Sequence, residues 1–194
     1  MTVQKVLILK GSPREVGNSA MLAGQVAAGA KDSGAQVESI YLHGLDIGPC
    51  DACDGCHGAL DDRCVVEDDM QDLYPLIREA DAIVYASPIY WFTITAQLKE
   101  FMDRCYALGS NTSTVEEHGL AGKRTGVVLT YGGDDPYDSG AINAIRMFQD
   151  AFNYVPSEMV GLVYGYASGI GAVVENKDLM ARAYDLGKKL GTAS

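Results

Sequence analysis

Apolar residues along the chain follow two alternating patterns. Val6 to Leu9 and Ala82 to Ala86 are short apolar runs, which are typical of strands buried on both faces. Between such runs apolar residues recur every three or four positions, as at Leu22, Val26 and Ala30, which is the spacing of a helix with one buried face. These patterns predict strands at about residues 2–9, 36–42, 82–86, 124–131 and 157–164, and helices at about 19–33, 68–79, 95–108, from after 137 to 152, and 176–190.

Strands that alternate with helices in this way predict a doubly wound α/β fold around a parallel sheet. At 194 residues the chain has the length of one domain, and no repeat or low-complexity linker divides it. Sheets of this kind bind ligands at the carboxyl ends of their strands. The loops after the first, third and fourth strands are therefore expected to meet at one crevice.

The loop after the first strand, Lys10 to Ser19, has the composition of an anion site. It opens a helix, whose first N–H groups lack intrahelical partners and carry partial positive charge. Ser12, Asn18 and Ser19 add side-chain donors, and Arg14 adds a forked cation suited to phosphate. The loop matches neither G-x-G-x-x-G nor G-x-x-x-x-G-K-[ST], and its hydroxyls and single arginine favour a monophosphate. The alternative is that Ser and Asn merely cap the helix.

The loop after the third strand concentrates aromatic side chains, Tyr90, Trp91 and Phe92, of which Trp91 is the only tryptophan in the chain. Aromatic residues usually belong to the core, but these follow the end of a strand beside the predicted phosphate loop. That position favours a flat aromatic ligand, and Gly132 and Gly133 allow close backbone approach from the other side. A phosphate at one end and a flat ring at the other indicate flavin mononucleotide (FMN).

Four of the five cysteines lie in one loop, residues 44–66, called the Cys-rich loop below. Cys50, Cys53, Cys56 and Cys64 have the spacing C-x2-C-x2-C-x7-C, a compact pattern that suits a [4Fe–4S] cluster better than zinc. The alternatives are a loop that binds no metal, and disulfides, which are rare in the cytoplasm.

Composition argues against several classes of function. The net charge of −11 at pH 7 argues against nucleic acid or an anionic membrane as partner, since both need a basic surface. No apolar run is long enough to span a bilayer, so a membrane protein is not expected. The first residues match no signal peptide, which makes a cytoplasmic location the default expectation.

Three motifs in order resemble a known family. They are Gly11-Ser12-Pro13-Arg14 with Gly17-Asn18-Ser19, then Ser87-Pro88-Ile89-Tyr90-Trp91, then Gln97-Leu98-Lys99 with Phe101-Met102-Asp103-Arg104. Together they resemble the NADPH-dependent FMN reductase family of flavodoxin-like proteins, over most of the chain, and the resemblance weakens after about Tyr137. The Cys-rich loop resembles the iron–sulfur flavoprotein branch of that family. The resemblance implies a three-layer sandwich whose five-stranded parallel sheet has the order 2-1-3-4-5.

The resemblance also implies a set of binding residues. The FMN contacts would be Ser12, Arg14, Asn18, Ser19, Pro88, Ile89, Tyr90, Trp91, Phe92, Tyr131, Gly132 and Gly133. The cluster ligands would be Cys50, Cys53, Cys56 and Cys64. Homodimers or homotetramers are implied, packed through the helix that carries Lys99, Asp103 and Arg104; the alternative for these charges is a solvated helix face with pairing four residues apart.

The expected function is that of an FMN-dependent oxidoreductase that takes a hydride from NAD(P)H. Electrons would pass to a small acceptor such as free flavin, a quinone or a nitro compound, or through a cluster to a protein partner. No side chain is assigned as acid or base, because a flavin carries this chemistry itself. The alternative function is a flavodoxin-type electron carrier without a substrate of its own.

Overall fold

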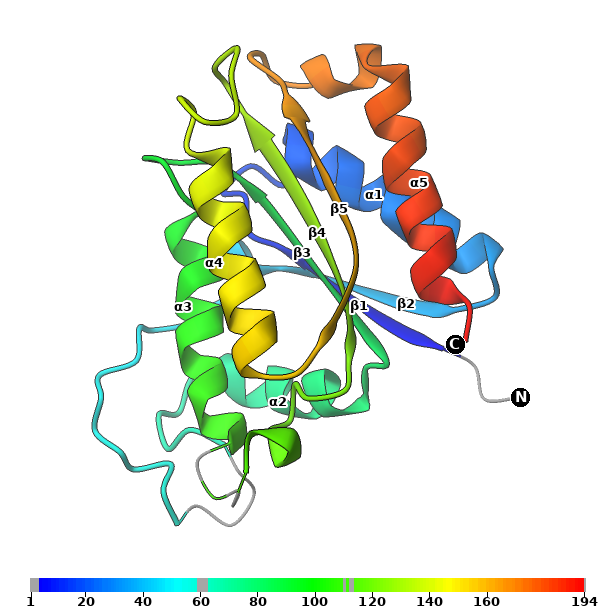
Figure 1. Cartoon of the computed structure of the whole chain (residues 1–194). Coiled ribbons are helices and arrows are strands. Elements are labelled where there is room, and N and C mark those ends of the chain that lie inside the picture. The colour runs from blue at the N-terminus through cyan, green and yellow to red at the C-terminus, as the bar shows by residue number, and fades with distance from the viewer. Residues whose placement is uncertain (1–3, 59–62, 110, 112–113, 194) are drawn as a thin grey trace.

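A five-stranded parallel sheet forms the centre of the molecule (Figure 1). The computed structural model describes residues 4–58, 63–109, 111 and 114–193. The strands are β1 (Lys5–Lys10), β2 (Gln36–Tyr41), β3 (Ala82–Pro88), β4 (Arg124–Tyr131) and β5 (Glu158–Tyr166). Their order across the sheet is β2-β1-β3-β4-β5 and every neighbouring pair is parallel, so the predicted fold class and strand order are confirmed.

Helices cover both faces of the sheet and give three layers (Figure 1). One face carries α1 (Asn18–Asp32) and α5 (Lys177–Gly191). The other carries α2 (Met70–Glu79), α3 (Ala96–Arg104) and α4 (Ala141–Tyr154). Short 3-10 turns are η1 (Leu42–Gly44), η2 (Cys105–Gly109), η3 (Val115–Glu117) and η4 (Ala172–Glu175). The helix predicted over 95–108 therefore ends at Arg104 and continues as the tighter turn η2.

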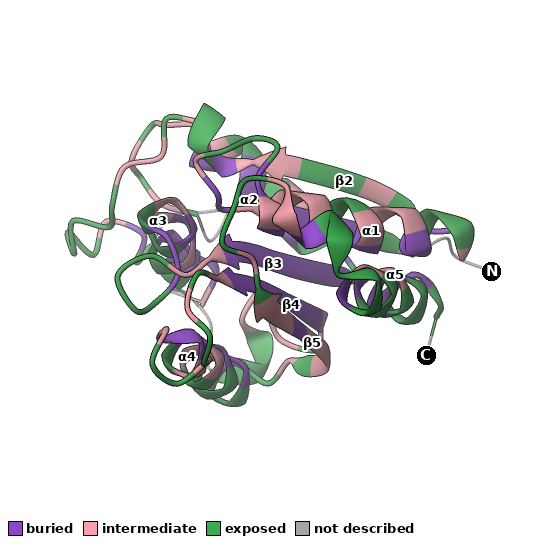
Figure 2. Cartoon of the chain, turned by 90° about the horizontal axis from the view of Figure 1, so that it is seen from above, coloured by how far each residue is buried: buried purple, intermediate pink, exposed green. Residues whose placement is uncertain are grey.

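Alternation along the strands divides the core between the two helical layers. In β1, Val6 and Ile8 pack with the residues of α1 and α5, whereas Leu7 and Leu9 pack with those of α2, α3 and α4. Each such fully buried side chain contributes roughly 1.5–3 kcal/mol by its removal from water. Because both faces are covered, β3 and β4 are buried along most of their length, while the edge strand β2 is partly exposed (Figure 2).

The register of the strands brings their carboxyl ends to one edge of the sheet. Lys10 at the end of β1 pairs with Ala86, and Pro88 at the end of β3 pairs with Thr130. The loops after β1, β3 and β4 therefore leave the sheet side by side. Among the described residues, no helix combines the length and apolar character that a membrane span requires.

Candidate functional site

The loop after β1 presents backbone N–H groups at the start of α1. The helix begins at Asn18 after the N-cap Gly17, which supplies no side-chain cap, and no acidic residue lies in its first turn. The first N–H groups are therefore left for another acceptor, and the helix dipole adds partial positive charge there. Ser12 and Ser19 are buried beside them, whereas Arg14 is exposed. This is the geometry of an anion site.

Neighbouring elements hold this loop in place. The N–H of Gly11 donates to the carbonyl of Ala86 (2.8 Å), and the carbonyl of Gly11 accepts from the Thr95 hydroxyl (2.7 Å). The Tyr41 hydroxyl, at the end of β2, donates to the carbonyl of Pro13 (2.8 Å). Contacts from β2, β3 and the start of α3 therefore fix the loop before any ligand binds.

The Asn18 side chain has partners within the protein. Its amide nitrogen donates to the carbonyls of Ala167 (3.4 Å) and Gly169 (2.7 Å), and its oxygen accepts from the N–H of Val173 (3.2 Å). These bonds tie the start of α1 to the chain that follows β5. Asn18 can therefore meet an anion through its backbone N–H while its side chain positions the neighbouring segment.

A cavity of about 180 Å³ lies where these loops meet. Its lining residues come from the loop after β1, the end of β3, the end of β4 and the chain after β5: Ser12, Arg14, Gly17, Asn18, Ser19, Pro88, Ile89, Tyr90, Thr130, Tyr131, Gly132 and Ala167. Nine of these residues are in the predicted set, and Trp91, Phe92 and Gly133 of that set lie outside the lining. Gly17, Thr130 and Ala167 were not predicted. The rule that ligands bind at the carboxyl ends of the strands points to Thr130 and Ala167.

The aromatic loop after β3 forms a tight turn with an uncommon backbone. Trp91 and Phe92 both have positive φ, 48° and 69°, and Tyr90 and Thr93 exchange backbone hydrogen bonds across them. This resembles a type I′ turn, whose central positions normally hold Asn and Gly. Each strained residue costs on the order of 1–3 kcal/mol. The turn nevertheless leaves Trp91 91% exposed and Phe92 54% exposed beside the cavity.

The start of α4 supports this turn. The Asn143 amide donates to the carbonyl of Phe92 (3.3 Å). At Gly140 a Cβ atom would lie 2.3 Å from the Cα of Phe92, so only glycine allows the two backbones to approach this closely. The backbone of the turn is thus held by contacts from another element rather than by its own residue preferences.

The cysteines of the Cys-rich loop stand in different environments. Cys50 and Cys53 are exposed, Cys64 is half-buried, and Cys56 is buried against the core. Within the part of the chain that the structure describes, no three side chains of His, Cys, Asp or Glu are arranged to hold a metal ion. The four thiols as placed here therefore do not form the predicted cluster site. Residues 59–62, between Cys56 and Cys64, lie outside the described residues.

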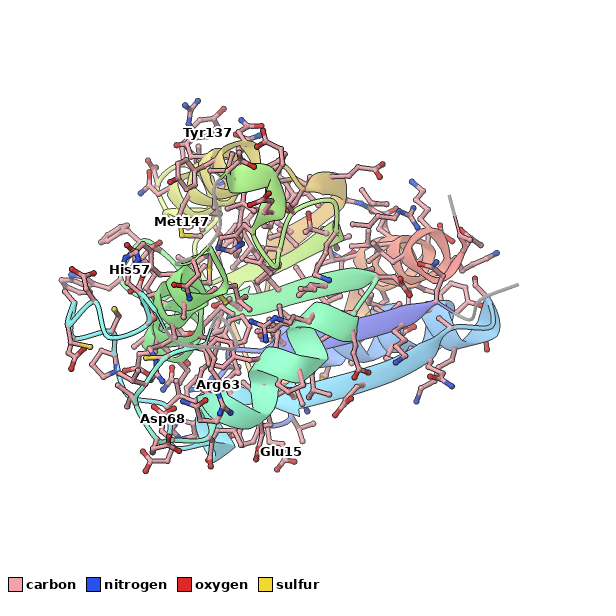
Figure 3. The ribbon with its side chains drawn as sticks, turned by 90° about the horizontal axis from the view of Figure 1, so that it is seen from below. Glu15, His57, Arg63, Asp68, Tyr137 and Met147 are labelled. Carbon is pink, nitrogen blue, oxygen red and sulfur yellow. The ribbon has the colours of Figure 1, made fainter. Side chains whose placement is uncertain are left out.

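The Cys-rich loop contacts the far end of α3. The His57 ring and the Tyr106 hydroxyl are 2.9 Å apart, and the Asn111 amide donates to the carbonyl of Cys56 (3.1 Å). Figure 3 shows this end of the molecule from below, with His57 beside α3. The cavity at the carboxyl ends of the strands lies near the other end of α3, where Thr95 contacts Gly11. The nine residues of α3 separate the two regions by roughly 12 Å along the helix axis.

A buried ion pair closes the base of the Cys-rich loop. The Arg104 side chain is fully buried and bonds to the Asp68 carboxylate (Nη2 to Oδ1, 3.0 Å), to the carbonyl of Gly48 (3.0 Å) and to that of Val66 (3.4 Å). Burial disfavours the ionised form of Asp68, but hydrogen bonds from Arg104 and from the Gly48 N–H outweigh it and hold its pKa below the ordinary value.

Arg104 corrects one expectation. It lies on neither an oligomer surface nor a solvated helix face, because its position on α3 turns it inward against Asp68. Lys99 and Asp103 do form the exposed pair expected on that helix (2.6 Å).

The chain is similar to known flavoproteins along most of its length. The family described as NADPH-dependent FMN reductase matches residues 4–167. An iron–sulfur flavoprotein of Archaeoglobus fulgidus is 32% identical over 97% of this chain and 80% of its own length. An FMN-dependent NADH:quinone oxidoreductase of a Shewanella strain is 30% identical over 91% of this chain and 94% of its own.

Similarity to a solved structure supports the fold. The Trp repressor binding protein of Bacillus subtilis superposes with a TM-score of 0.69 at 24% identity, over 94% of this chain and 98% of that one. The fold and the crevice thus define a flavodoxin-like protein with a cavity at the carboxyl edge of its sheet. The chain belongs to the NADPH-dependent FMN reductase family, which confirms the resemblance, and it is an NAD(P)H-dependent flavin oxidoreductase of that family.

Proposed function

We propose that the crevice binds FMN with its phosphate at the start of α1 and its ring beside the aromatic turn. The observation that carries this proposal is the convergence of the loops after β1, β3 and β4 on one cavity whose floor is an uncapped helix N-terminus. Ser12, Ser19 and the first N–H groups of α1 would bind the phosphate, and Arg14 would neutralise it from the exposed side.

The size of the cavity suits only part of the cofactor. Its volume of about 180 Å³ is below the roughly 300–1,000 Å³ of pockets that enclose a whole ligand. We therefore place the phosphate and ribityl chain inside it, lined by Pro88, Ile89 and Tyr131. The ring would lie at its mouth, between the Tyr90–Phe92 turn and the backbone at Gly132 and Gly133.

The residues of the crevice hold and orient, and a bound FMN supplies the hydride and electron chemistry. Burial raises the pKa of Tyr131, as do the nearby Tyr164 and Asp135, so its hydroxyl stays protonated and can donate to a ligand. The exposed Trp91 and Phe92 leave room above the ring for NAD(P)H and then for a small acceptor such as a quinone, a nitro compound or free flavin.

A second candidate function adds a [4Fe–4S] cluster on Cys50, Cys53, Cys56 and Cys64, which would pass electrons singly to a protein partner. The spacing of the cysteines supports it, as does similarity to proteins named iron–sulfur flavoprotein. As placed here the thiols stand apart, so the Cys-rich loop would have to rearrange. The reaction proposed above for the crevice does not require this cluster.

We also propose that the protein forms a homodimer or homotetramer. Exposed aromatic side chains at Tyr137 and Tyr166, outside the lining of the crevice, form surface that a neighbouring copy could cover. Sedimentation of the FMN-loaded protein would measure this, and a monomer at micromolar concentration would contradict it.

Steady-state turnover tests the proposed function. The FMN-loaded protein should oxidise NADH or NADPH continuously when a quinone or ferricyanide is supplied. FMN bound without any such oxidation would instead indicate an electron carrier. Iron and sulfide analysis of protein purified without oxygen tests the second candidate, and iron well below four atoms per chain would exclude the cluster.

A further inference from the structure

A second and larger cavity, of about 510 Å³, lies between the far ends of α3 and α4. Its floor is formed by Ile83 and Tyr85 of β3 and Thr125 of β4, near the amino ends of those strands. It shares no lining residue with the crevice at the carboxyl ends. The cavity therefore lies apart from the proposed flavin site, and its volume is in the range that encloses small ligands.

The walls of this cavity are mainly apolar. The side chains that form them include Met102 and Cys105 at the end of α3, Leu120 from the segment that precedes β4, and Phe152 and Val155 at the end of α4. Such walls favour a largely apolar, uncharged molecule, because the contact removes apolar surface of both the ligand and the wall from water.

Most polar groups around the cavity are already paired. The Thr125 hydroxyl donates to the carbonyl of Glu158 (3.1 Å), and the Ser157 hydroxyl to that of Leu120 (2.8 Å). The Lys123 ammonium donates to the carbonyls of Ala80 (2.7 Å) and Arg78 (2.9 Å). These groups therefore require no hydrogen bond from a ligand.

The Tyr85 hydroxyl, on the floor of the cavity, is not paired in this way. Tyr85 is 2% exposed, and no described residue forms a hydrogen bond with its hydroxyl. Its ring is fixed between Phe148 and Phe152, with centroids 5.5 Å from each. Tyr85 lines the cavity, so a ligand bound there can accept the hydrogen bond that its hydroxyl does not make within the described protein.

The chemistry of the two groups on the floor limits the ligand further. Burial raises the pKa of Tyr85, so the hydroxyl stays neutral and donates one hydrogen bond. Burial also raises the pKa of the nearby Cys105 thiol, which therefore stays protonated and is not a nucleophile. A ligand is thus expected to bind reversibly and to accept one hydrogen bond.

We propose that this cavity, between α3 and α4, binds a small, largely apolar carbonyl compound whose oxygen accepts a hydrogen bond from the Tyr85 hydroxyl. The site is separate from the flavin crevice, so the compound binds there without exchanging a hydride with FMN. The proposal stands independently of the function proposed for the crevice.

Fluorescence titration of the FMN-loaded protein with prodan, a naphthalene that carries one ketone, tests the proposal. Saturable binding is expected, unaffected by NADH or by excess FMN. Tyr85→Phe keeps the ring and should weaken prodan binding about three- to tenfold, the loss expected for one hydrogen bond. Dimethylaminonaphthalene, which lacks the ketone, should bind both proteins equally.

Two cavity-filling variants locate the site. Ala151→Trp on α4 and Met102→Trp on α3 should each abolish prodan binding while FMN content is kept. Ala181→Trp, at an exposed position of α5, is the matched control and should bind prodan as the wild type does. The two substitutions lie on opposite walls of the cavity, so the test can still be made if one of the variants fails to fold.

Several results would overturn the proposal. They are the absence of saturable binding, displacement of prodan by NADH, binding that survives both filling variants, or equal loss of both probes in Tyr85→Phe. An oligomer that binds no prodan and dissociates in Ala151→Trp would show that a second copy of the chain covers the cavity instead.

Discussion

The loop after β1 and the Cys-rich loop both carry a motif, but they differ in what holds them. The loop after β1 is fixed along its length by the backbone of β3 and by the hydroxyls of Tyr41 and Thr95. The Cys-rich loop is held firmly at its base by Arg104 and Asp68, and its first two cysteines are exposed beyond that base. The loop after β1 has a fixed shape beside the cavity, whereas the four cysteines of the Cys-rich loop are not brought together at one point.

The difference follows from where each loop leaves the fold. A loop at the carboxyl edge of a parallel sheet lies between neighbouring strands and the helix that follows, so the sheet itself determines its shape. The Cys-rich loop extends along α3 to its far end, where its described contacts include the side chains of Tyr106 and Asn111 and no strand of the sheet flanks it in the same way. The cysteine motif on this loop therefore indicates which metal chemistry is available, but it does not determine where the four thiols lie.

The largest effect is expected at the base of the Cys-rich loop. Asp68→Asn would leave the buried Arg104 charge without its partner and should lower the free energy of unfolding by about 3 kcal/mol. Urea unfolding measures this. Asp150→Asn, which breaks the exposed pair with Arg146, is the matched control and should have no measurable effect. Equal effects of the two substitutions would mean that Arg104 does not depend on Asp68.

The same pair predicts a pH dependence with a defined sign. The pKa of Asp68 is lowered in the folded protein, so its stabilising contribution is complete above the unfolded value of about 3.9 and is lost as the pH falls through the folded value. The difference in stability between wild type and Asp68→Asn should therefore shrink below about pH 4. A difference that stays constant down to pH 2 would contradict the pairing.

At the aromatic turn we expect a smaller effect of the opposite sign, which is a gain in stability. Replacing Trp91-Phe92 by Asn-Gly supplies the residues that positive φ favours, and should raise the free energy of unfolding by about 1 kcal/mol. The same change removes the aromatic surface beside the crevice and should lower kcat/KM for NAD(P)H oxidation. Increased stability with unchanged turnover would show that the turn has no role in the reaction.

The smallest effect is expected at the exposed cysteines. In protein treated with a chelator, Cys50→Ser with Cys53→Ser should leave FMN content and the unfolding midpoint unchanged. Cys56→Ser introduces a hydroxyl into the core and should cost about 1–2 kcal/mol. A large loss of stability in the Cys50, Cys53 double variant would show that these thiols are engaged with one another or with a ligand.

The sequence predicted the fold because apolar runs and helical spacing report burial directly. The same reasoning placed most of the crevice, since a strand followed by Gly, Ser and Asn at a helix start is a local pattern. It could not show that the Asn18 side chain binds the chain after β5, because Val173 is far away in sequence. Nor could it show that Arg104 turns inward, since spacing on α3 permits either face.

Two further features could not be predicted from the sequence, for a similar reason. The positive φ of Trp91 and Phe92 depends on the close approach of Gly140, which only the packing of α4 defines. The cavity above Tyr85 arises between two helices that are distant in the chain, and a tyrosine in an apolar strand gives no sign of an unpaired hydroxyl.

The central claim, that the loop after β1 binds the phosphate of FMN, is tested by comparing FMN with riboflavin, which lacks the phosphate. Charge-assisted hydrogen bonds contribute about 1.5–3 kcal/mol each, so apo-protein should bind FMN at least on the order of 100-fold more tightly than riboflavin. In Ser12→Ala with Arg14→Ala, whose folding is checked by circular dichroism, the ratio should fall by about tenfold or more. Equal binding of the two flavins by the wild type would contradict the account.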